Sequence, residues 1–314
     1  MSPRALIFGD PQILRPVHRV VACAGAEIMQ LDDLQRLVPQ AAAAQPRWVL
    51  FHLEHAGDCA PQALRQVHQV CPEAALILLG TAPTPIQLKA LLDEPWLAHI
   101  FALESPWLMA DLTATLTKLQ GADLFGLDRY MPWGTRLLSH KLTSNQEKGL
   151  IFDAIEDLLG GMGIGGRVVP HLHAIADELL MNALYDAPVD GLGQPKYTGR
   201  AKGDVITLQP HEQPTVHIGS DGRRFGISVT DPFGGLTAAT LRRYVGKGLR
   251  READQIDTKP GGAGLGLYML FNAVHTLCLN LAPSRCTQVI GLVDIQGSFR
   301  QIAGGPRALS LFSR

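Results

Sequence analysis

Cysteine is scarce in this sequence, and its few copies are widely spread. None of the five cysteines forms a CxxC pair with another. Structural zinc sites and disulfide scaffolds depend on close cysteine spacing or on cysteine density. We therefore expect neither, and the composition suits a reducing compartment such as the cytoplasm.

Long apolar runs and an excess of charge of one sign are missing as well. No apolar run approaches the roughly 20 residues that a membrane-spanning helix needs. The formal net charge is -1, which provides no attraction to nucleic acid or to a membrane surface. The N-terminus has a short apolar part followed at once by Asp10, unlike a signal peptide. We expect a cytoplasmic protein that binds neither nucleic acid nor membranes.

The chain does have enough apolar residues and enough length for two cores. Hydrophobic residues make up 46% of its 314 residues. A disordered protein is excluded by this fraction, and two globular domains fit the length.

Short apolar segments alternate with segments of helical composition through residues 1–120. The expected strands are 6–8, 48–52, 75–79 and 99–103, and the expected helices are 31–44, 61–70, 85–92 and 106–119. Repeats of roughly 30 residues are typical of βαβ units. The pattern predicts an α/β doubly wound, flavodoxin-like domain with a parallel sheet covered on both faces.

This first domain resembles the receiver domain of two-component response regulators in its layout. Asp10 follows the first strand, as an acidic residue does in receivers, and Thr81 fits the hydroxyl position. His52 stands where receivers carry the phosphoacceptor aspartate, and Ser105 replaces the lysine before a proline. The resemblance implies a pseudo-receiver that binds partners or dimerises without being phosphorylated. Another flavodoxin-like domain remains the alternative.

Residues 121–142 interrupt the helical and strand patterns with glycine and proline. A freely flexible linker is usually polar, whereas this segment carries Phe125, Tyr130, Met131 and Trp133. We expect an ordered linker that packs on a neighbouring domain. The second domain then comprises residues 143–314.

A helical segment at 169–187, the first box, carries a carboxylate and a carboxamide at helical spacing. Glu178 and Asn182 are four positions apart, so they project from one side of the helix. An amide oxygen can bind a hard cation such as Mg²⁺, and a carboxylate can orient or deprotonate a nucleophile. A polar pair on a solvated face would have the same spacing.

Two further stretches add to this pair. In the second box, 225–236, a β-branched strand ends at Asp231 and a glycine turn with Gly235 follows. The third box, 259–267, has several glycines in a predicted turn just before an apolar helix. Glycines before a helix N-terminus leave backbone N–H groups open to a phosphate. Each stretch alone is also compatible with an ordinary turn.

In this order the three boxes resemble the N, G1 and G2 boxes of the GHKL ATP-binding superfamily, over about 143–314. The resemblance implies an α+β sandwich that binds ATP and Mg²⁺. By the resemblance, Asn182 would hold Mg²⁺, Glu178 would be the general base or water-positioning residue, and Asp231 would bind the adenine amine, with Gly235 in the adjoining turn. The third box would hold the phosphates through Lys259, Gly262, Gly264, Leu265 and Gly266. Residues 237–259 would form an ATP lid with several cations.

One position departs from the superfamily pattern. Phe233 stands where the second box usually has its first glycine. Its ring could stack near the base or partly fill the site.

The sequence therefore predicts an ATP-binding signalling protein that acts as a Ser/Thr protein kinase, similar to anti-sigma-factor kinases, or as a slow ATPase. This prediction is compatible with a protein partner, which could be the Ser/Thr phosphoacceptor, and with a homodimer. The alternative is a non-catalytic scaffold whose nucleotide site is a switch or is empty. The third hypothesis is a histidine kinase that is phosphorylated on His140. In such kinases an acidic residue usually follows the histidine, whereas here a lysine follows His140.

Overall fold

The computed structural model describes residues 2–81, 90–91, 93–121, 123–197, 204–243 and 265–314. The chain forms two compact units. Unit 1 comprises Met1–Leu124 with Pro306–Ser310, and unit 2 comprises Phe125–Gly305 with Leu311–Arg314. Unit 2 therefore begins inside the segment expected as a linker.

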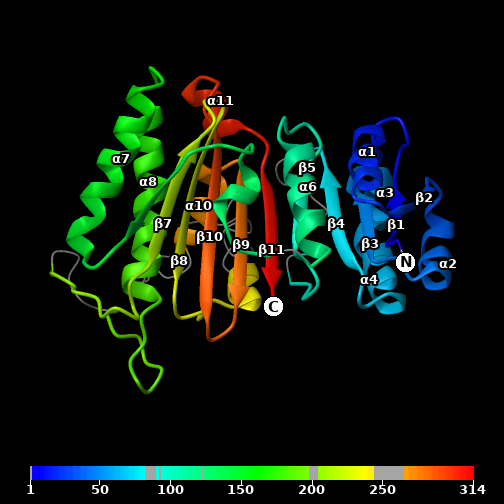
Figure 1. The fold of residues 1–314 in the computed structure, drawn as a ribbon. Helices are drawn as coiled ribbons and strands as arrows, with labels where there is room; N and C mark the ends of the chain where they lie inside the picture. Colours follow the sequence, from blue (N-terminus) through cyan, green and yellow to red (C-terminus); the bar gives the residue numbers. More distant parts are fainter. Residues whose placement is uncertain (1, 82–89, 92, 122, 198–203, 244–264) are drawn as a thin grey trace. The chain divides into compact units, whose positions relative to one another are not determined.

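Unit 1 is built on a parallel sheet with the strand order β2-β1-β3-β4-β5 (Figure 1). Its strands are β1 (Arg4–Phe8), β2 (Glu27–Leu31), β3 (Trp48–His52), β4 (Ala75–Gly80) and β5 (His99–Ala102). Its helices are α1 (Arg15–Cys23), α2 (Leu34–Ala44), α3 (Leu53–Ala56), η1 (Gly57–Cys59), α4 (Ala60–Val70) and α6 (Leu108–Leu119). Leu309 and Ser310 of β11 (Ala308–Ser313) pair antiparallel with β5.

The helices of unit 1 form two contacting pairs, α1 with α6 and α2 with α4. Right-handed crossovers in this strand order place these pairs on opposite faces of the sheet. The central strand β3 is buried along its whole length, with Trp48 and Leu50 in the core between α1, α6 and the sheet. The order is that of flavodoxin-like sheets, and we propose this classification for unit 1.

The expected strands at 6–8, 48–52, 75–79 and 99–103 are confirmed within a residue or two, as are the helices at 61–70 and 106–119. The helix expected at 31–44 begins only at Leu34, because residues 27–31 form strand β2, which the sequence did not predict. The helix expected at 85–92 falls almost wholly outside the described residues.

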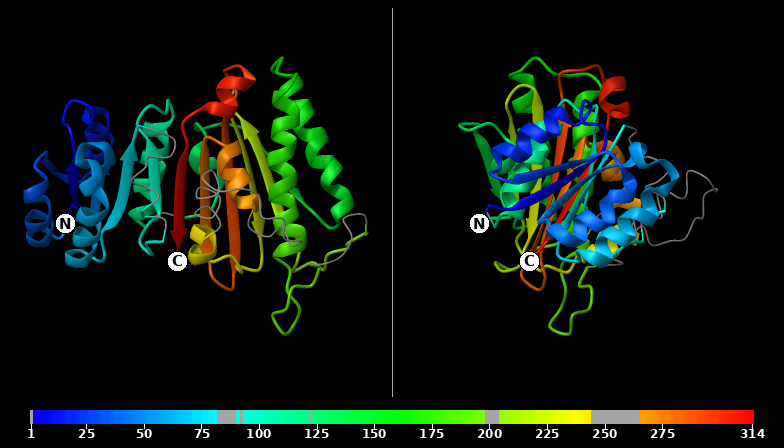
Figure 2. Two further views of the ribbon diagram at one scale, coloured as in Figure 1. Left: turned by 180° about the vertical axis from the view of Figure 1, so that it is seen from behind. Right: turned by 90° about the vertical axis from the view of Figure 1, so that its right-hand side faces the viewer.

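Unit 2 is built on an antiparallel sheet with the order β9-β10-β8-β7-β6 (Figure 2). Its strands are β6 (Leu137–Lys141), β7 (Thr215–Ser220), β8 (Arg224–Asp231), β9 (Thr276–Ala282) and β10 (Cys286–Asp294). Its helices are η2 (Leu127–Tyr130), η3 (Asn145–Glu147), α7 (Lys148–Gly160), α8 (Val168–Met181), η4 (Asn182–Asp186), α10 (Leu265–Ala273) and α11 (Phe299–Gly304). Helix α8 contacts α7, α10 and strand β8, so the first box shares one helical layer with α10, which begins with the described end of the third box at Leu265.

From Phe125 onward, the segment expected as a linker is part of the unit 2 fold. A Cβ on Gly226 of β8 would lie 2.3 Å from Met131 Cε and 2.9 Å from Leu127 Cδ1, so η2 packs directly on the sheet. Gly126 N donates to Gln288 Oε1 (3.0 Å), which also accepts from Asn280 Nδ2 (2.8 Å). Buried apolar and polar contacts thus fix this segment to unit 2.

Other expectations for unit 2 have mixed outcomes. The sequence also predicts strands at 215–219, 287–294 and 308–312 and a hairpin turn at 220–223, and the structure confirms all of them. The alternation at 204–208 predicts a further strand. This prediction is wrong, because within the described part of the chain the stretch forms only a single bridge, between Thr207 and Ser144. The sequence did not predict β9 or α11. No helix in the described residues is long and apolar enough to cross a membrane.

Candidate functional site

Helix α8 carries the first box and is anchored by its apolar face. Leu172, Ile175, Ala176, Leu179 and Leu180 are buried on that face. Glu178 lies on the adjoining side and is half-buried. Helical periodicity therefore keeps its carboxylate beside the core rather than in open solvent.

The Glu178 carboxylate reaches the start of α10. A Cβ placed on Gly266 would lie 1.6 Å from Glu178 Oε1 and 2.5 Å from Glu178 Cδ. Only glycine leaves room for the carboxylate at this position. Gly266 is the second residue of α10, where backbone N–H groups and the helix dipole favour a negative charge. The structure thus brings Glu178 of the first box and Gly266 of the third box into contact.

Asn182 begins a short π-helix, η4, that continues α8. Inserted π turns are frequent at functional sites because they redirect side chains out of the α-helical register. Among the residues that the structure describes, Asn182 Nδ2 is buried and has no hydrogen-bond partner. A buried amide without a partner is costly, and a bound polar ligand would satisfy it. Asn182 is therefore a candidate for ligand contact.

Asp231 ends strand β8 and is 8% exposed. Its Oδ1 accepts hydrogen bonds from Phe233 N (2.9 Å) and Gly234 N (3.2 Å). Burial raises the pKa of the Asp231 carboxyl, and the two N–H groups offset part of this rise. A desolvated carboxylate at a strand end is suited to accept a hydrogen bond from a ligand amine.

The glycine that the turn requires is Gly234 rather than Gly235. Gly234 has φ +64°, and a Cβ there would lie 2.4 Å from Ala282 O. Gly235 is exposed, and a Cβ on it would meet nothing within 4 Å. Phe233 is half-buried in the same turn. Among the described residues, the space next to Gly235 is therefore open.

Part of the predicted phosphate site lies outside the described residues, namely Lys259, Gly262 and Gly264. Leu265 is the first residue of α10. At the start of the expected lid, burial lowers the pKa of the Arg242 guanidinium.

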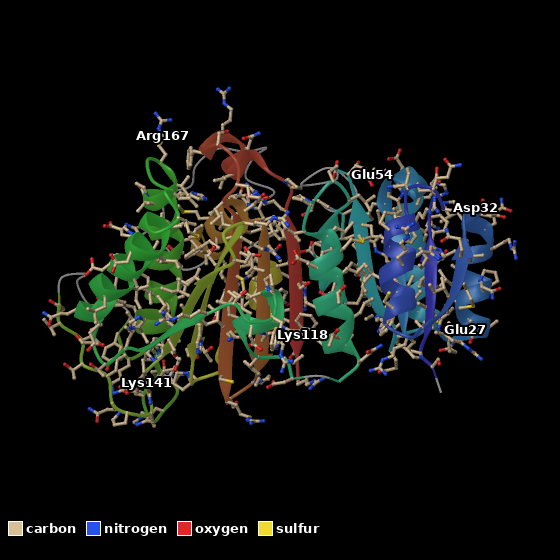
Figure 3. All side chains as sticks on the ribbon, turned by 45° about the horizontal axis from the view of Figure 1, so that its top comes forward. Glu27, Asp32, Glu54, Lys118, Lys141 and Arg167 are labelled. Atoms are coloured by element: carbon tan, nitrogen blue, oxygen red, sulfur yellow. The ribbon has the colours of Figure 1, made fainter. Side chains whose placement is uncertain are left out.

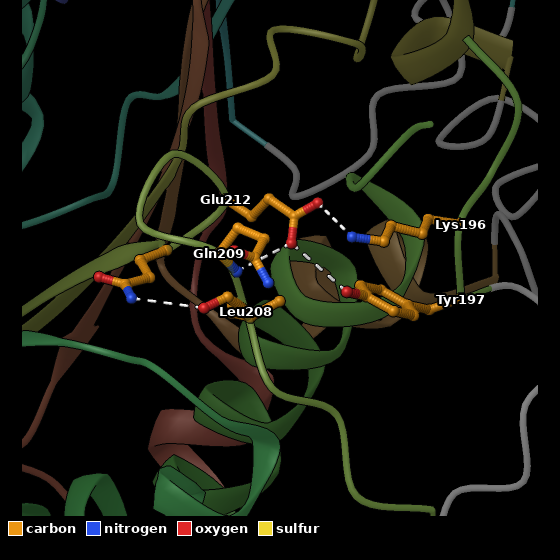
Figure 4. Close-up of polar contacts among 6 residues, drawn as sticks. Lys196, Tyr197, Leu208, Gln209 and Glu212 are labelled. Carbon is orange, nitrogen blue, oxygen red and sulfur yellow. Dashed lines mark hydrogen bonds and ion pairs between the residues drawn. The ribbon is translucent and has the colours of Figure 1, made fainter. Parts of the chain in front are cut away.

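The segment between the first and second boxes, residues 188–224 as far as the structure describes them, contains an ion pair between the exposed Lys196 and the buried Glu212 (Figure 4). Glu212, 2% exposed, accepts from Lys196 Nζ (2.6 Å), Gln209 N (3.0 Å) and Tyr197 OH (3.4 Å). Burial acts to raise the pKa of the Glu212 carboxyl, but the bonds from Lys196 and Gln209 outweigh it, so its pKa lies below the ordinary value. The cluster therefore ties Lys196 and Tyr197 to the turn at Gln209 and Glu212.

A second contact ties this segment to the π-helix. Asn145 Nδ2 donates to Tyr185 OH of η4 (2.6 Å) and to Asp204 O (2.8 Å), while its Oδ1 accepts from Ile206 N (2.9 Å). The sequence did not indicate Asn145 or Glu212, since a single polar residue in a loop gives no periodic or motif signal.

In unit 1, His52, which was expected to replace a receiver phosphoacceptor, lies next to Glu54. His52, at the end of β3, is 4% exposed, and its Nε2 lies 3.3 Å from Glu54 Oε2. Glu54, labelled in Figure 3, accepts through Oε1 from Thr81 N (2.7 Å) and Thr81 Oγ1 (2.9 Å). Burial lowers the pKa of the His52 imidazole, and the Glu54 carboxylate partly opposes this. The Thr81 hydroxyl is therefore already bound by a carboxylate of the same unit.

Two described residues of unit 2 have chemistry that a magnesium nucleotide would need. The buried Asn182 Nδ2, a donor without a partner among the described residues, could bond to a phosphate oxygen, and the desolvated Asp231 could accept from the adenine amine. The space that a Cβ on Gly266 would take is occupied by the Glu178 carboxylate. Within the described residues, no group of three His, Cys, Asp or Glu side chains could hold a metal ion. Mg²⁺ in nucleotide sites usually takes few protein ligands, because phosphates and waters complete its coordination.

Comparisons with known proteins leave the family open. No protein-family model and no curated protein matches the chain. Among solved structures, it is similar to a chain of the SiaB-SiaC complex from Pseudomonas aeruginosa, with 15% identity and a TM-score of 0.32. That match covers 50% of this chain and 88% of the other. At this TM-score the similarity carries no argument about fold or function.

Proposed function

We propose that unit 2 is a GHKL-type domain that binds Mg-ATP, and that the protein is a signalling regulator acting as a Ser/Thr protein kinase or slow ATPase. The observation that carries the proposal is the contact between the Glu178 carboxylate and Gly266 at the start of α10. Such a contact places a potential base beside a helix N-terminus that can bind phosphate.

The ligand would be held by residues of all three boxes. The Asn182 amide would face the metal and phosphates, Asp231 would accept a hydrogen bond from the adenine amine, and the start of α10 would face the phosphates. Bound Mg-ATP supplies a transferable phosphoryl group whose charge the metal partly neutralises.

Glu178 would orient, and accept a proton from, the attacking hydroxyl or water. A carboxylate on a packed helix is held in place, which favours catalysis by positioning. Its contact with Gly266 fixes the carboxylate on the phosphate side of α8.

A non-catalytic scaffold is the second candidate, and one observation favours it. Phe233 is half-buried in the turn that follows Asp231, where the superfamily has glycine. In this reading the nucleotide site acts as a switch or stays empty. The third reading, a histidine kinase, has less support because His140 lies in strand β6, paired with Val216, and not in a helical hairpin.

The experiment that separates the first two readings is the Glu178→Gln substitution. We expect ATP turnover, measured by phosphate release or by transfer to a partner, to fall about 100-fold or more, as loss of a general base does. Binding of Mg-ATP should persist. Equal turnover in wild type and variant, at a level above the background of a protein-free control, would reject Glu178 as the base. Absence of turnover in both would favour the scaffold.

A further inference from the structure

A groove in unit 1 lies between one face of α1 and the edge strand β2. It is lined by Arg15, His18, Arg19 and Ala22 of α1 and by Ile28 and Gln30 of β2. The helical residues follow the i, i+3, i+4, i+7 spacing of a single helix face. The groove has a volume of about 440 Å³, within the range of ligand-binding clefts.

Hydrogen bonds fix the floor of this groove. His18 Nε2 lies 2.5 Å from Gln30 Oε1. Gln30 Nε2 in turn donates to Gly9 O (2.8 Å) and Leu31 O (3.2 Å). These bonds hold α1 against β2, so the groove is formed before any partner arrives, which lowers the entropic cost of binding.

The outer edge of β2 is unpaired within the described part of the sheet, where β2 pairs only with β1. Glu27 N donates to Pro3 O and Leu31 O accepts from Gly9 N, so these odd-numbered residues direct their backbone groups toward β1. Because the direction alternates along a strand, the N–H and C=O groups of Ile28 and Gln30 point outward. The two residues offer backbone hydrogen bonds to one more strand.

The side chains above this edge are cationic. Arg15 and Arg19 are exposed, and neither forms an ion pair with a described residue. Two acidic residues at the ends of β2 are labelled in Figure 3, namely Glu27, its first residue, and Asp32, which follows it, and neither lines the groove. The groove is therefore complementary to a negatively charged partner.

The spacing of Arg15 and Arg19 on α1 matches the spacing of alternate side chains in an extended partner. On a helix, side chains four positions apart are about 6 Å apart. In an extended segment, side chains two positions apart lie on one face, about 6.6 Å apart. Two acidic side chains in an i, i+2 arrangement can thus meet Arg15 and Arg19 while the backbone pairs with Ile28 and Gln30.

We propose that this groove binds an extended, acidic segment of a protein partner, which adds to unit 1 as a strand beside β2. Strand addition supplies backbone hydrogen bonds, and alternate side chains supply specificity. The proposal does not depend on nucleotide binding by unit 2.

The test uses a fluorescein-labelled seven-residue peptide of alternating glutamate and valine, with the full chain at low ionic strength. Fluorescence anisotropy should report saturable binding that weakens as salt is added. Arg15→Glu combined with Arg19→Glu should weaken binding about tenfold or more, as should the milder Gln pair. Arg36→Glu, an exposed arginine on α2, is the matched control and should leave binding unchanged.

Two control peptides test the mode of binding. A peptide with lysine in place of glutamate should not bind, and one with proline at the central valine should bind at least about tenfold more weakly, because proline has no N–H to donate. Equal binding of the proline peptide would overturn strand addition. No binding of the glutamate peptide, binding unaffected by the Arg15 and Arg19 changes, or binding of inorganic phosphate in its place would overturn the proposal. Circular dichroism of each variant checks that unit 1 remains folded.

Discussion

Gly266→Ala is expected to separate the stability of unit 2 from its activity. The new Cβ would lie 1.6 Å from Glu178 Oε1 and 2.5 Å from Glu178 Cδ, far inside contact distance. Gly266 is in a helix, so the main chain itself accommodates alanine. The overlap is therefore relieved by movement of the Glu178 side chain, which is flexible, rather than by movement of α10.

Two opposing contributions to the free energy of unfolding of this variant are of similar size. An alanine in a helix is favoured over glycine by about 1 kcal/mol. Forcing a side chain off its preferred rotamer costs about 0.5–1.5 kcal/mol. The free energy of unfolding should therefore change by about 1 kcal/mol or less. If Glu178 is the base, moving its carboxylate by more than about 1 Å should reduce turnover roughly 100-fold.

The assay combines thermal unfolding, Mg-ATP binding and ATP turnover on the same protein preparation. Gly149→Ala is the matched control, because Gly149 is also the second residue of a helix, α7, and a Cβ there meets nothing within 4 Å. The control should gain stability and keep its turnover. A Gly266→Ala variant with wild-type turnover and stability would refute the claim that this contact positions Glu178.

Three further predictions concern polar contacts outside the nucleotide site. Glu54→Gln removes the carboxylate that raises the pKa of His52, so an NMR titration should show that pKa falling further below 6.5, and an unchanged pKa would contradict the pairing. Glu212→Gln should lower the free energy of unfolding by about 1–3 kcal/mol at pH 7. Because the pKa of Glu212 lies below 4.5, this stabilisation is present above that pH and lost as the pH falls through the folded-state pKa, so the wild-type and variant denaturation midpoints should converge in acid. Gln288→Leu leaves buried partners without hydrogen bonds and should cost about 2 kcal/mol or more in urea unfolding, whereas a neutral result would show that solvent replaces those bonds.

The sequence predicted the strands of unit 1 that are buried on both faces. Strands β1, β3 and β4 are continuous apolar runs because both of their faces are covered. Strand β2 was missed because it is an edge strand, mostly half-buried, with a glutamate and a glutamine among its five residues. The segment 204–208 alternates like a strand, but among the described residues it forms only the bridge between Thr207 and Ser144.

The candidate site could be predicted only in part, because some of its contacts join segments that are far apart in the sequence. Helical periodicity placed Glu178 and Asn182 on one side of α8, since this depends on local geometry alone. The contact between Glu178 and Gly266 depends on the packing of α8 against α10, which no local pattern encodes. The Glu212 ion pair likewise joins loop residues that come together only after folding.

Calorimetric titration of the full chain with Mg-ATP tests the central claim most directly, with Asp231→Asn as the paired variant. The asparagine keeps an oxygen that can accept from Phe233 N and Gly234 N, and it removes the buried charge, so the fold should be retained. Loss of a hydrogen bond to a charged group costs about 1.5–3 kcal/mol, which corresponds to roughly 10- to 150-fold in affinity. Our account predicts micromolar binding by the wild type that the variant weakens by this factor. No binding by the folded wild type, or equal binding by both, would contradict a nucleotide site at Asp231.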